Sequence, residues 1–341
     1  MKVEVCKDST VWDAYVEASP NAGNYHRWVW KQVIETTYGH QAYYLMASEN
    51  GALLGILPLF LIRSRLFGHS LVSMPFFSYG GVLANSAEAR HHLLAEAVEL
   101  GRNLGVRHIE LRQGSDSLGE TGWYDTTAKV TMLVSLPASV EEHWTRISAR
   151  LRKRIRYASK HGLTSQWGGG EAVDLFYPIF ASNMRNLGTP VYPRNWFENM
   201  CQYAPEIRIL SVWDEGRPVA AAFVTPFRGV LELPWAASLP ESRERFSPLL
   251  LYWNLLEWAI ENGYRCVDLG RCTPGSGNHQ FKRHWICEEK PLHWYHWLAS
   301  GERLPEMHAE NPRYRLAVRV WQHLPLGVAN WLGPRVVRSI P

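Results

Sequence analysis

The most constraining feature of the sequence is that its two halves repeat one order of secondary-structure elements. Hydrophobic spacing and turn residues give this order as two helices, a β-hairpin, a strand, a long helix and a short strand. In the first half these elements are expected at residues 12–18, 26–37, 41–48, 52–63, 71–77, 86–104 and 108–112, after a short strand at 3–6. In the second half they are expected at 173–186, 194–203, 207–213, 217–225, 230–236, 247–261 and 266–270.

Turn and capping residues mark the same places in both halves. Glu49-Asn50-Gly51 and Asp214-Glu215-Gly216 are turn sequences inside the predicted hairpins. The long helices are expected to begin at Ser86 and at Ser247-Pro248, with serine as the N-cap residue. The letters agree as well, since NGALLGILPLF resembles EGRPVAAAFVT and ELGRNLGVRHIELR resembles WAIENGYRCVDLGR. A repeat of this length indicates duplication of a whole domain.

The length of 341 residues suits two domains of about 150 residues each. We expect a first domain at 1–137, a basic inter-domain helix at 138–163, a second domain at 164–305 and a basic amphipathic tail at 306–341. The fold class is α/β (α+β), with a mixed, mostly antiparallel sheet flanked by helices in each domain. GNAT acyltransferases have this order, and their acyl donor lies where two strands splay apart near the start of the central helix. Another mixed α/β fold with similar turns is the alternative.

Composition and the N-terminus exclude several classes of protein. Hydrophobic residues make up 46% and charged residues 20% of the chain, which is typical of a globular protein. No apolar run is long enough to span a bilayer, and MKVEVCKDSTVWDAY has no signal-peptide core, so we expect a cytoplasmic protein. The five scattered cysteines, without a CxxC pair, favour reduced thiols and no metal site. The net charge of +4 is too small to indicate a nucleic-acid partner by itself.

A coenzyme A donor is disfavoured by the loops before the long helices. GNAT enzymes that use acetyl-CoA usually carry Q/R-x-x-G-x-G/A there, and its backbone donors surround the pyrophosphate. This chain has FFSYGGVLANS before the first long helix and WAASLPESRERFSP before the second. The nearest glycine cluster, RCTPGSG at residues 271–277, comes only after the next strand.

Several motifs in order resemble the FemAB-type proteins of the GNAT superfamily. The longest is residues 253–297, WNLLEWAIENGYRCVDLGRCTPGSGNHQFKRHWICEEKPLHWYHW. MPFFSYGG at 74–81, RLRKRIRYASKHGL at 150–163 and MRNLGTPVYP at 184–193 also match, so the resemblance covers roughly residues 3 to 300. More particularly, the sequence resembles the FemAB-related proteins associated with XrtA/PEP-CTERM, that is exosortase and exopolysaccharide, systems.

The resemblance implies tandem GNAT domains and an N-acyltransferase. The family reaction passes an activated acyl group, in Fem proteins an aminoacyl ester on tRNA, to an amine of a nucleotide- or lipid-linked cell-envelope precursor. We expect no tightly bound cofactor, and the donor stays open between aminoacyl-tRNA and an acyl thioester. The interval from Trp213 to Phe246 is too short for the helical arm with which several Fem enzymes hold tRNA. A non-catalytic GNAT pair that binds at the membrane and a CoA-dependent acetyltransferase are the alternatives.

Lys282 is the first catalytic candidate. It belongs to a Phe281-Lys282 pair after the last core strand, and the resemblance implies that this lysine lies at the acyl-transfer centre. A cation there stabilises a phosphate or the oxyanion that develops during aminolysis. The alternative is a solvated lysine on a short helix.

Asp268 and Arg271 flank the end of the last predicted strand. Asp268 is a catalytic candidate that accepts a proton or orients the amine, and Arg271 is a candidate for substrate binding. Glu110 and Arg112 occupy like places in the first half, so a structural acid–arginine pair is the alternative. His279, in a Gly/Ser loop, is a further candidate for substrate binding and for the role of a base. The alternative is a surface histidine without a function.

Three more residues are expected to line an acceptor groove shared by both halves. Arg185 and Tyr192 match the family region that lines this groove, and an arginine fork suits a diphosphate. Tyr79, in Tyr79-Gly80-Gly81, matches a first-domain loop that faces it, with a tight turn as the alternative.

Basic residues concentrate in the predicted inter-domain helix and in the tail. In the helix they are Arg146, Arg150, Arg152, Lys153, Arg154, Arg156 and Lys160. This stretch is a candidate for tRNA contact, and a solvated helix that packs through Leu151, Ile155 and Ala158 is the alternative.

The tail has five arginines and no acidic residue after Asn311. Its apolar residues at near-helical spacing are Trp321, Leu324, Val328, Trp331 and Leu332. This pattern suits a peripheral helix on anionic lipid at the inner face of the membrane. A tail that docks on its own domain fits equally well.

Overall fold

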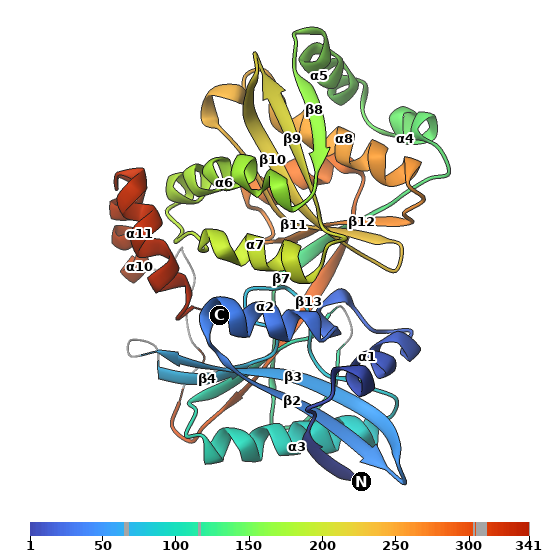
Figure 1. The fold of residues 1–341 in the computed structure, drawn as a ribbon, viewed down its shortest axis with the longest axis vertical. Coiled ribbons are helices and arrows are strands. Elements are labelled where there is room, and N and C mark those ends of the chain that lie inside the picture. The colour runs from blue at the N-terminus through green and yellow to red at the C-terminus, as the bar shows by residue number, and fades with distance from the viewer. Residues whose placement is uncertain (65–67, 115–116, 303, 305–311, 341) are drawn as a thin grey trace. The chain divides into compact units, whose positions relative to one another are not determined.

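The chain divides into two compact units that are not contiguous in sequence. The computed structural model describes residues 1–341 except 65–67, 115–116, 303, 305–311 and 341 (Figure 1). The first unit comprises Met1–Ala128, Pro291–Glu306 and Arg338–Pro341, and the second comprises Lys129–Lys290 and Met307–Val337.

The sheet of the first unit is antiparallel except for one parallel pair. Its strand order is β1 (Lys2–Val5), β2 (Gln41–Glu49), β3 (Ala52–Ser64), β4 (Gly68–Val72), β6 (His108–Arg112) and β13 (Glu288–Leu298), and β5 (Leu83–Ala84) pairs with β3. The parallel pair is β4 with β6. The helices are α1 (Ser9–Ala18), α2 (Val29–Tyr38) and α3 (Ala87–Asn103), with a short 3₁₀ turn, η1 (Asn24–His26). Figure 1 shows α3 on one face of this sheet and α1 and α2 on the other.

The second unit repeats this layout. Its strand order is β7 (Tyr124–Ser135), β12 (Cys266–Cys272), β11 (Val230–Ser238), β10 (Arg217–Phe227), β9 (Arg208–Asp214) and β8 (Thr164–Gly168), with β11 and β12 as the parallel pair. Its helices are α4 (Val140–Arg146), α5 (Ala149–Lys160), α6 (Val173–Leu187), α7 (Arg194–Tyr203), α8 (Ser247–Glu261), α9 (Gly277–Lys282), α10 (Pro312–Gln322) and α11 (Leu326–Val337), with 3₁₀ turns η2 (Gly170–Ala172), η3 (Pro240–Ser242) and η4 (Arg283–Trp285).

Each unit takes one strand from the part of the chain that was expected to form the other. The second part of β7 pairs antiparallel with β12, from Ser135 opposite Cys266 to Val130 opposite Cys272. The second part of β13 pairs with β6. The compact units therefore differ from the contiguous ranges 1–137 and 164–305 by this reciprocal exchange. The sequence prediction contained neither strand, because nothing local in a strand specifies its partner.

Most predicted elements are confirmed within a few residues, and three details are wrong. Ser86 caps α3 by accepting a hydrogen bond from the Ala89 amide. Ser247, by contrast, is the first residue of α8, and its hydroxyl lies 2.7 Å from that of Ser242 instead of capping. The helix expected at 138–161 is broken at Ile147 and restarts at Ser148, whose side chain caps α5.

The third wrong detail is the strand expected at 71–77. It ends at Val72, because Met74 and Phe76 have positive φ angles of 48° and 75° that are incompatible with an extended strand.

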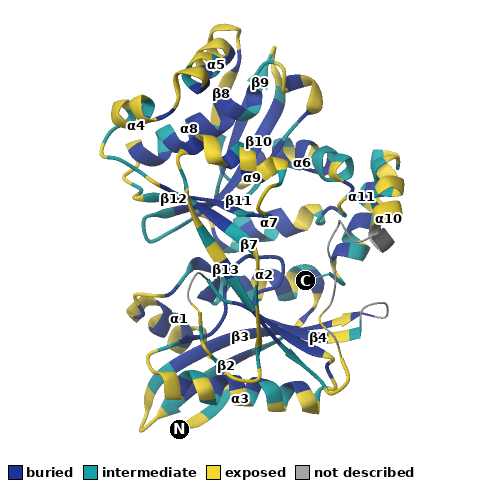
Figure 2. Ribbon diagram, turned by 180° about the vertical axis from the view of Figure 1, so that it is seen from behind, coloured by how far each residue is buried: buried dark blue, intermediate teal, exposed yellow. Residues whose placement is uncertain are grey.

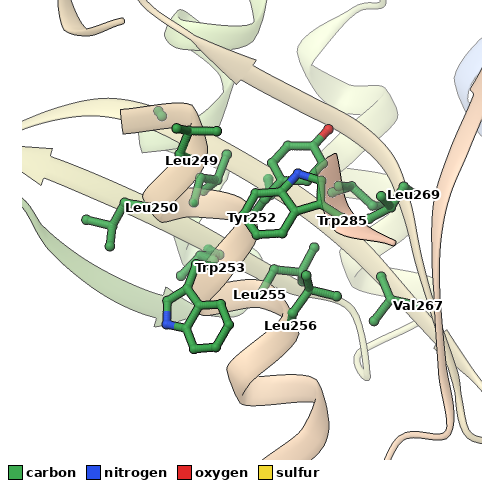
Figure 3. Packing of buried hydrophobic residues seen from close by; sticks show 14 of the residues in the cluster. Leu249, Leu250, Tyr252, Trp253, Leu255, Leu256, Val267, Leu269 and Trp285 are labelled. Atoms are coloured by element: carbon green, nitrogen blue, oxygen red, sulfur yellow. The ribbon is translucent and has the colours of Figure 1, made fainter. Parts of the chain in front are cut away.

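Each unit has its own hydrophobic core between sheet and central helix. In the second unit α8 contributes a dense set of apolar side chains, among them Leu250, Leu255 and Leu256, which pack with Val267 and Leu269 of β12 (Figure 3). In Figure 2 the central strands of both units are buried, whereas most of α5 is exposed. The rigid α8 and β12 hold the residues that follow β12 in place.

Candidate active site

The pairing between strands β11 and β12 ends just before Gly270. They are paired in parallel register from Val230 opposite Cys266 only as far as Glu232 opposite Asp268. A register shift in β12 follows, between Asp268 and Arg271. Gly270 has φ +76°, and a Cβ there would lie 2.9 Å from the Leu233 carbonyl oxygen. The close approach of these two backbone segments therefore requires glycine.

Lys282 lies directly against this irregular backbone. Its side chain is at the end of α9, a short helix capped by Ser276, and the residue is only 4% exposed. Nζ donates hydrogen bonds to the carbonyl oxygens of Gly270, at 2.7 Å, and Arg271, at 3.1 Å. The alternative of a solvated surface lysine is therefore wrong. Among the described residues these two carbonyls use two of the three ammonium donors and leave one for another acceptor.

The surroundings of Lys282 destabilise the charged form of its ammonium group. Burial lowers the pKa of the ammonium group below its ordinary value, and Arg271 adds to this, although Cys272, Asp268 and Cys287 act in the opposite direction. Within the described part of the chain no carboxylate forms a salt bridge with Nζ. A partly desolvated cation of this kind interacts strongly with any anion that reaches it.

Asp268 fixes the shape of the β12 backbone. The residue is 4% exposed, and its Oδ1 accepts from the Thr131 hydroxyl at 2.6 Å and from the Gly270 amide at 2.8 Å. Glu232, 7% exposed, lies opposite Asp268 in the parallel register. Sequence reasoning missed Thr131 and Glu232, although a glutamate inside the apolar run of β11 was a usable signal.

Arg271 and His279 complete the surroundings of the lysine. Arg271 is partly exposed and contributes its carbonyl to Lys282. His279 is 7% exposed, so the expectation of a surface histidine is wrong. Its Nδ1 accepts from the Gly275 amide, which leaves the proton on Nε2 for Glu289 Oε2 at 2.9 Å. Both ring nitrogens thus hold the loop before α9.

The Tyr192 ring packs against β11, beyond the point where the pairing of β11 with β12 ends. Its ring lies 5.7 Å from that of Trp235 and 6.0 Å from that of Trp196. Trp235 is two residues beyond Leu233, or about 7 Å along the strand. Tyr192 therefore belongs to an aromatic wall on the same strand that Gly270 contacts. Sequence reasoning missed Trp235 and Trp196, because tryptophans in this chain are too frequent to stand out.

Arg185 is held by the C-terminal helices. One of its Nη atoms donates to the Gln322 carbonyl of α10 at 3.1 Å. Its Nε is buried and has no hydrogen-bond partner among the described residues. An arginine in this state is pre-positioned and keeps a donor for a ligand.

Tyr79 lies in the first unit, in the loop between β4 and β5. The loop needs its two glycines, since Gly80 has φ +115° and a Cβ on Gly81 would lie 2.1 Å from Gln113 Oε1. His26 contacts the Gly81 carbonyl at 3.2 Å. The backbone at residues 79–82 is neither a turn nor a bend, so the tight-turn alternative is not confirmed, and Tyr79 itself is partly exposed.

The structure thus brings together four of the seven predicted site residues. Lys282, Asp268 and Arg271 meet at the β12 irregularity, and His279 is on the same helix as Lys282. Tyr192 is linked to them through β11, and Arg185 is tied to α10 instead.

Several basic side chains of α5 make contacts within the protein itself. Arg152 donates to three backbone carbonyls at the end of α4 and the following turn, while Arg154 and Arg156 lie over aromatic rings. Leu151, Ile155 and Ala158 form its buried face, as the packing alternative predicted. Among the described residues no helix has the length and apolar character needed to cross a membrane.

Comparisons with known proteins agree with this architecture. Residues 146–283 match the family described as Acetyltransferase (GNAT) domain. No curated protein matches the chain closely enough to count as a relative. Among solved structures, FemX is 14% identical with a TM-score of 0.67, covering 93% of this chain and 100% of its own.

Two further structures are similar in fold. The C-terminal domain of a putative lysylphosphatidylglycerol synthetase from Agrobacterium fabrum is 14% identical with a TM-score of 0.56, covering 80% of this chain and 88% of its own. A tandem GNAT protein from the clavulanic acid biosynthesis pathway is 11% identical with a TM-score of 0.58, covering 89% of this chain and 99% of its own. At these identities the likeness concerns the fold. The predicted fold class is confirmed: the chain is similar in fold to tandem GNAT proteins, and its residues 146–283 match a GNAT acetyltransferase domain.

Proposed function

We propose that this protein is a FemAB-like N-acyltransferase that passes an aminoacyl or acyl group to an amine of a cell-envelope precursor. The acceptor is a peptidoglycan intermediate or an amino sugar of an exopolysaccharide, the latter in keeping with the resemblance to proteins of XrtA/PEP-CTERM systems. The observation that carries the proposal is the buried Lys282 ammonium beside the point where the pairing of β11 with β12 ends. The names of two structures of similar fold, FemX and the lysylphosphatidylglycerol synthetase, support an envelope-directed reaction.

The chemistry requires little more than positioning and one cation. The neutral amine of the acceptor attacks the acyl carbonyl, so that a C–N bond forms and the C–O or C–S bond to the donor breaks. The third N–H of Lys282 donates to the carbonyl oxygen, which becomes the oxyanion, and a contact of this type lowers the barrier by about 3 kcal/mol. Asp268 is proposed to accept the amine proton and to return it to the departing oxygen or sulfur of the donor, because it is the buried carboxylate nearest in sequence to the Gly270 and Arg271 carbonyls.

In this proposal Tyr192, Arg185 and Arg271 of the second unit bind the acceptor, and a role for Tyr79 of the first unit stays a prediction from the sequence resemblance. The unpartnered Nε of Arg185 suits a phosphate oxygen, and the Tyr192 ring offers a flat surface to a sugar or base. His279 positions α9, and so Lys282, through its two ring contacts.

The donor in this proposal is aminoacyl-tRNA or an acyl thioester. Exposed Arg150, Lys153 and Lys160 on α5 form the proposed tRNA contact within residues 146–160. The described residues between β9 and α8 include no α-helix, so the helical arm of several Fem enzymes has no counterpart there.

The test is a donor screen with the purified chain. Aminoacyl-tRNA, acyl-CoA and acyl-carrier-protein donors are combined with nucleotide-linked and lipid-linked amino-sugar acceptors, and products are read by mass spectrometry. Transfer to an acceptor amine, lost in Lys282→Met, is the expected result. Transfer to none of the acceptors by a folded protein overturns the proposal.

A further inference from the structure

The two C-terminal helices pack on α6, each through one face. Both α10 and α11 contact α6. A Cβ on Gly188, at the end of α6, would lie 2.5 Å from a methyl group of Val318 in α10. A Cβ on Gly333 of α11 would lie 2.8 Å from the amide nitrogen of Val191, and Ala329 is buried on the same side. The tail is therefore docked on its own unit, with defined inward faces.

The opposite faces of these helices present large apolar side chains to solvent. On α10, Leu316 and Val320 are one turn apart and are 70% and 56% exposed. On α11, Val328 and Trp331 are 41% and 61% exposed. Because both helices turn one face to α6, these four residues lie on the side away from it. We name them the tail surface; Figure 2 shows exposed residues along both helices.

The charged residues of the two tail helices are all of one sign. After Glu310 the sequence contains five arginines and no aspartate or glutamate. Arg315, Arg319 and Arg335 are exposed, and the guanidinium of Arg335 lies over the ring of Trp331 at 4.2 Å. Arg319 and Val320 also line a shallow depression with His323 and Leu324. Exposed apolar side chains flanked only by arginine are the combination that binds an anionic membrane interface.

We propose that the tail surface docks on an anionic lipid surface. Leu316, Val320 and Trp331 enter the interface between headgroups and acyl chains, and the exposed arginines contact lipid phosphates. A second copy of the chain is the less suitable occupant, because it would bring the exposed Arg315, Arg319 and Arg335 against the same three charges of the other copy. The tail docks on its own domain and binds lipid with its other face, so the two alternatives from the sequence are compatible.

Membrane docking has a consequence for the acceptor. Arg185, the proposed phosphate ligand, is bound to the Gln322 carbonyl on the inner side of α10. Lipid contact by the outer side of α10 places this arginine within one helix diameter of the interface, about 10 Å. A lipid-linked acceptor is then favoured over a nucleotide-linked one. Only this consequence rests on the proposed function; the lipid contact itself stands on the tail surface alone.

Vesicle flotation of the full chain tests the docking without any assay of activity. The probes are vesicles of phosphatidylcholine alone and of phosphatidylcholine mixed with phosphatidylglycerol. We expect binding only to the mixed vesicles, and weaker binding at high salt. Arg315→Ala with Arg319→Ala should lower the partition coefficient about 25-fold, since each arginine near such a surface contributes about fivefold.

A second variant tests the apolar part of the tail surface. Leu316→Ser with Val320→Ser should abolish flotation and leave the melting curve unchanged, because both side chains are exposed. Val11→Ser, at a 45% exposed valine of α1, is the matched control and should float like wild type. No binding to either vesicle, or equal binding by wild type and both double variants, overturns the proposal. Self-association that the double serine variant abolishes, without vesicle binding, would assign the tail surface to a second copy and also overturn it.

Discussion

Replacement of Lys282 by methionine separates a catalytic ammonium from a structural one. Methionine keeps much of the length and volume of the side chain but removes the charge and all three donors. The carbonyls of Gly270 and Arg271 then lose their partner, and an unsatisfied buried acceptor costs about 1–3 kcal/mol. Relief of the desolvation of the ammonium group offsets part of this cost. We therefore expect the free energy of unfolding to fall by about 1–3 kcal/mol.

The rate should fall by much more than this loss of stability explains. Loss of one oxyanion donor lowers turnover by a factor of about 100 to 1,000 in an enzyme that remains folded. The assay is turnover with the donor found in the screen, at a temperature below the melting transition of the variant. Urea denaturation of the same sample gives the free energy of unfolding.

A destabilised variant away from the site is the control. Leu93→Ala removes a fully buried side chain from α3, in the first unit, and should cost about 2–5 kcal/mol. Its turnover per folded molecule should stay close to wild type. If Lys282→Met also keeps wild-type turnover, the ammonium group only stabilises the β12 backbone, and its catalytic assignment is wrong. Lys282→Arg is the companion variant, because it keeps the charge and should restore part of the rate if a cation is what matters.

Three further predictions concern the scaffold. Burial lowers the pKa of His26 from 6.5 to about 4, so its neutral form stabilises the fold above pH 6.5 and about 3 kcal/mol is lost as the pH falls towards 4; urea midpoints against pH should show this loss, and His26→Gln should flatten the profile. Gly270→Ala introduces a Cβ 2.9 Å from the Leu233 carbonyl at φ +76°, and should lower both the melting temperature and turnover, whereas an unchanged melting curve would show that this close approach does not require glycine. Thr131→Val removes the 2.6 Å hydrogen bond to the buried Asp268 carboxylate and should cost about 1.5–3 kcal/mol in urea unfolding, with Thr131→Ser close to wild type; equal stability of the valine variant would show that the bond contributes nothing.

Local features of the sequence determined most elements of both units. The α3 helix follows from Ser86 as an N-cap and from buried Leu93 and Ala97 on one face, which are short-range signals. The internal repeat then fixed the fold class, because two copies of one element order leave few other arrangements. The family motif around Phe281-Lys282 indicated where to look for chemistry.

Tertiary structure decided what those residues touch. The sequence could not show that β7, which follows the first half, pairs with β12, because strand pairing depends on contacts between distant residues. For the same reason Thr131 was not foreseen as the partner of Asp268, although the two are 137 residues apart and 2.6 Å apart in space. The burial of Lys282 and its two carbonyl partners depends on a positive φ at Gly270 and on the path of α9. The sequence identified Lys282 as a candidate, but its burial depends on the folded chain. Desolvation is a property of the packed surroundings and not of the residue.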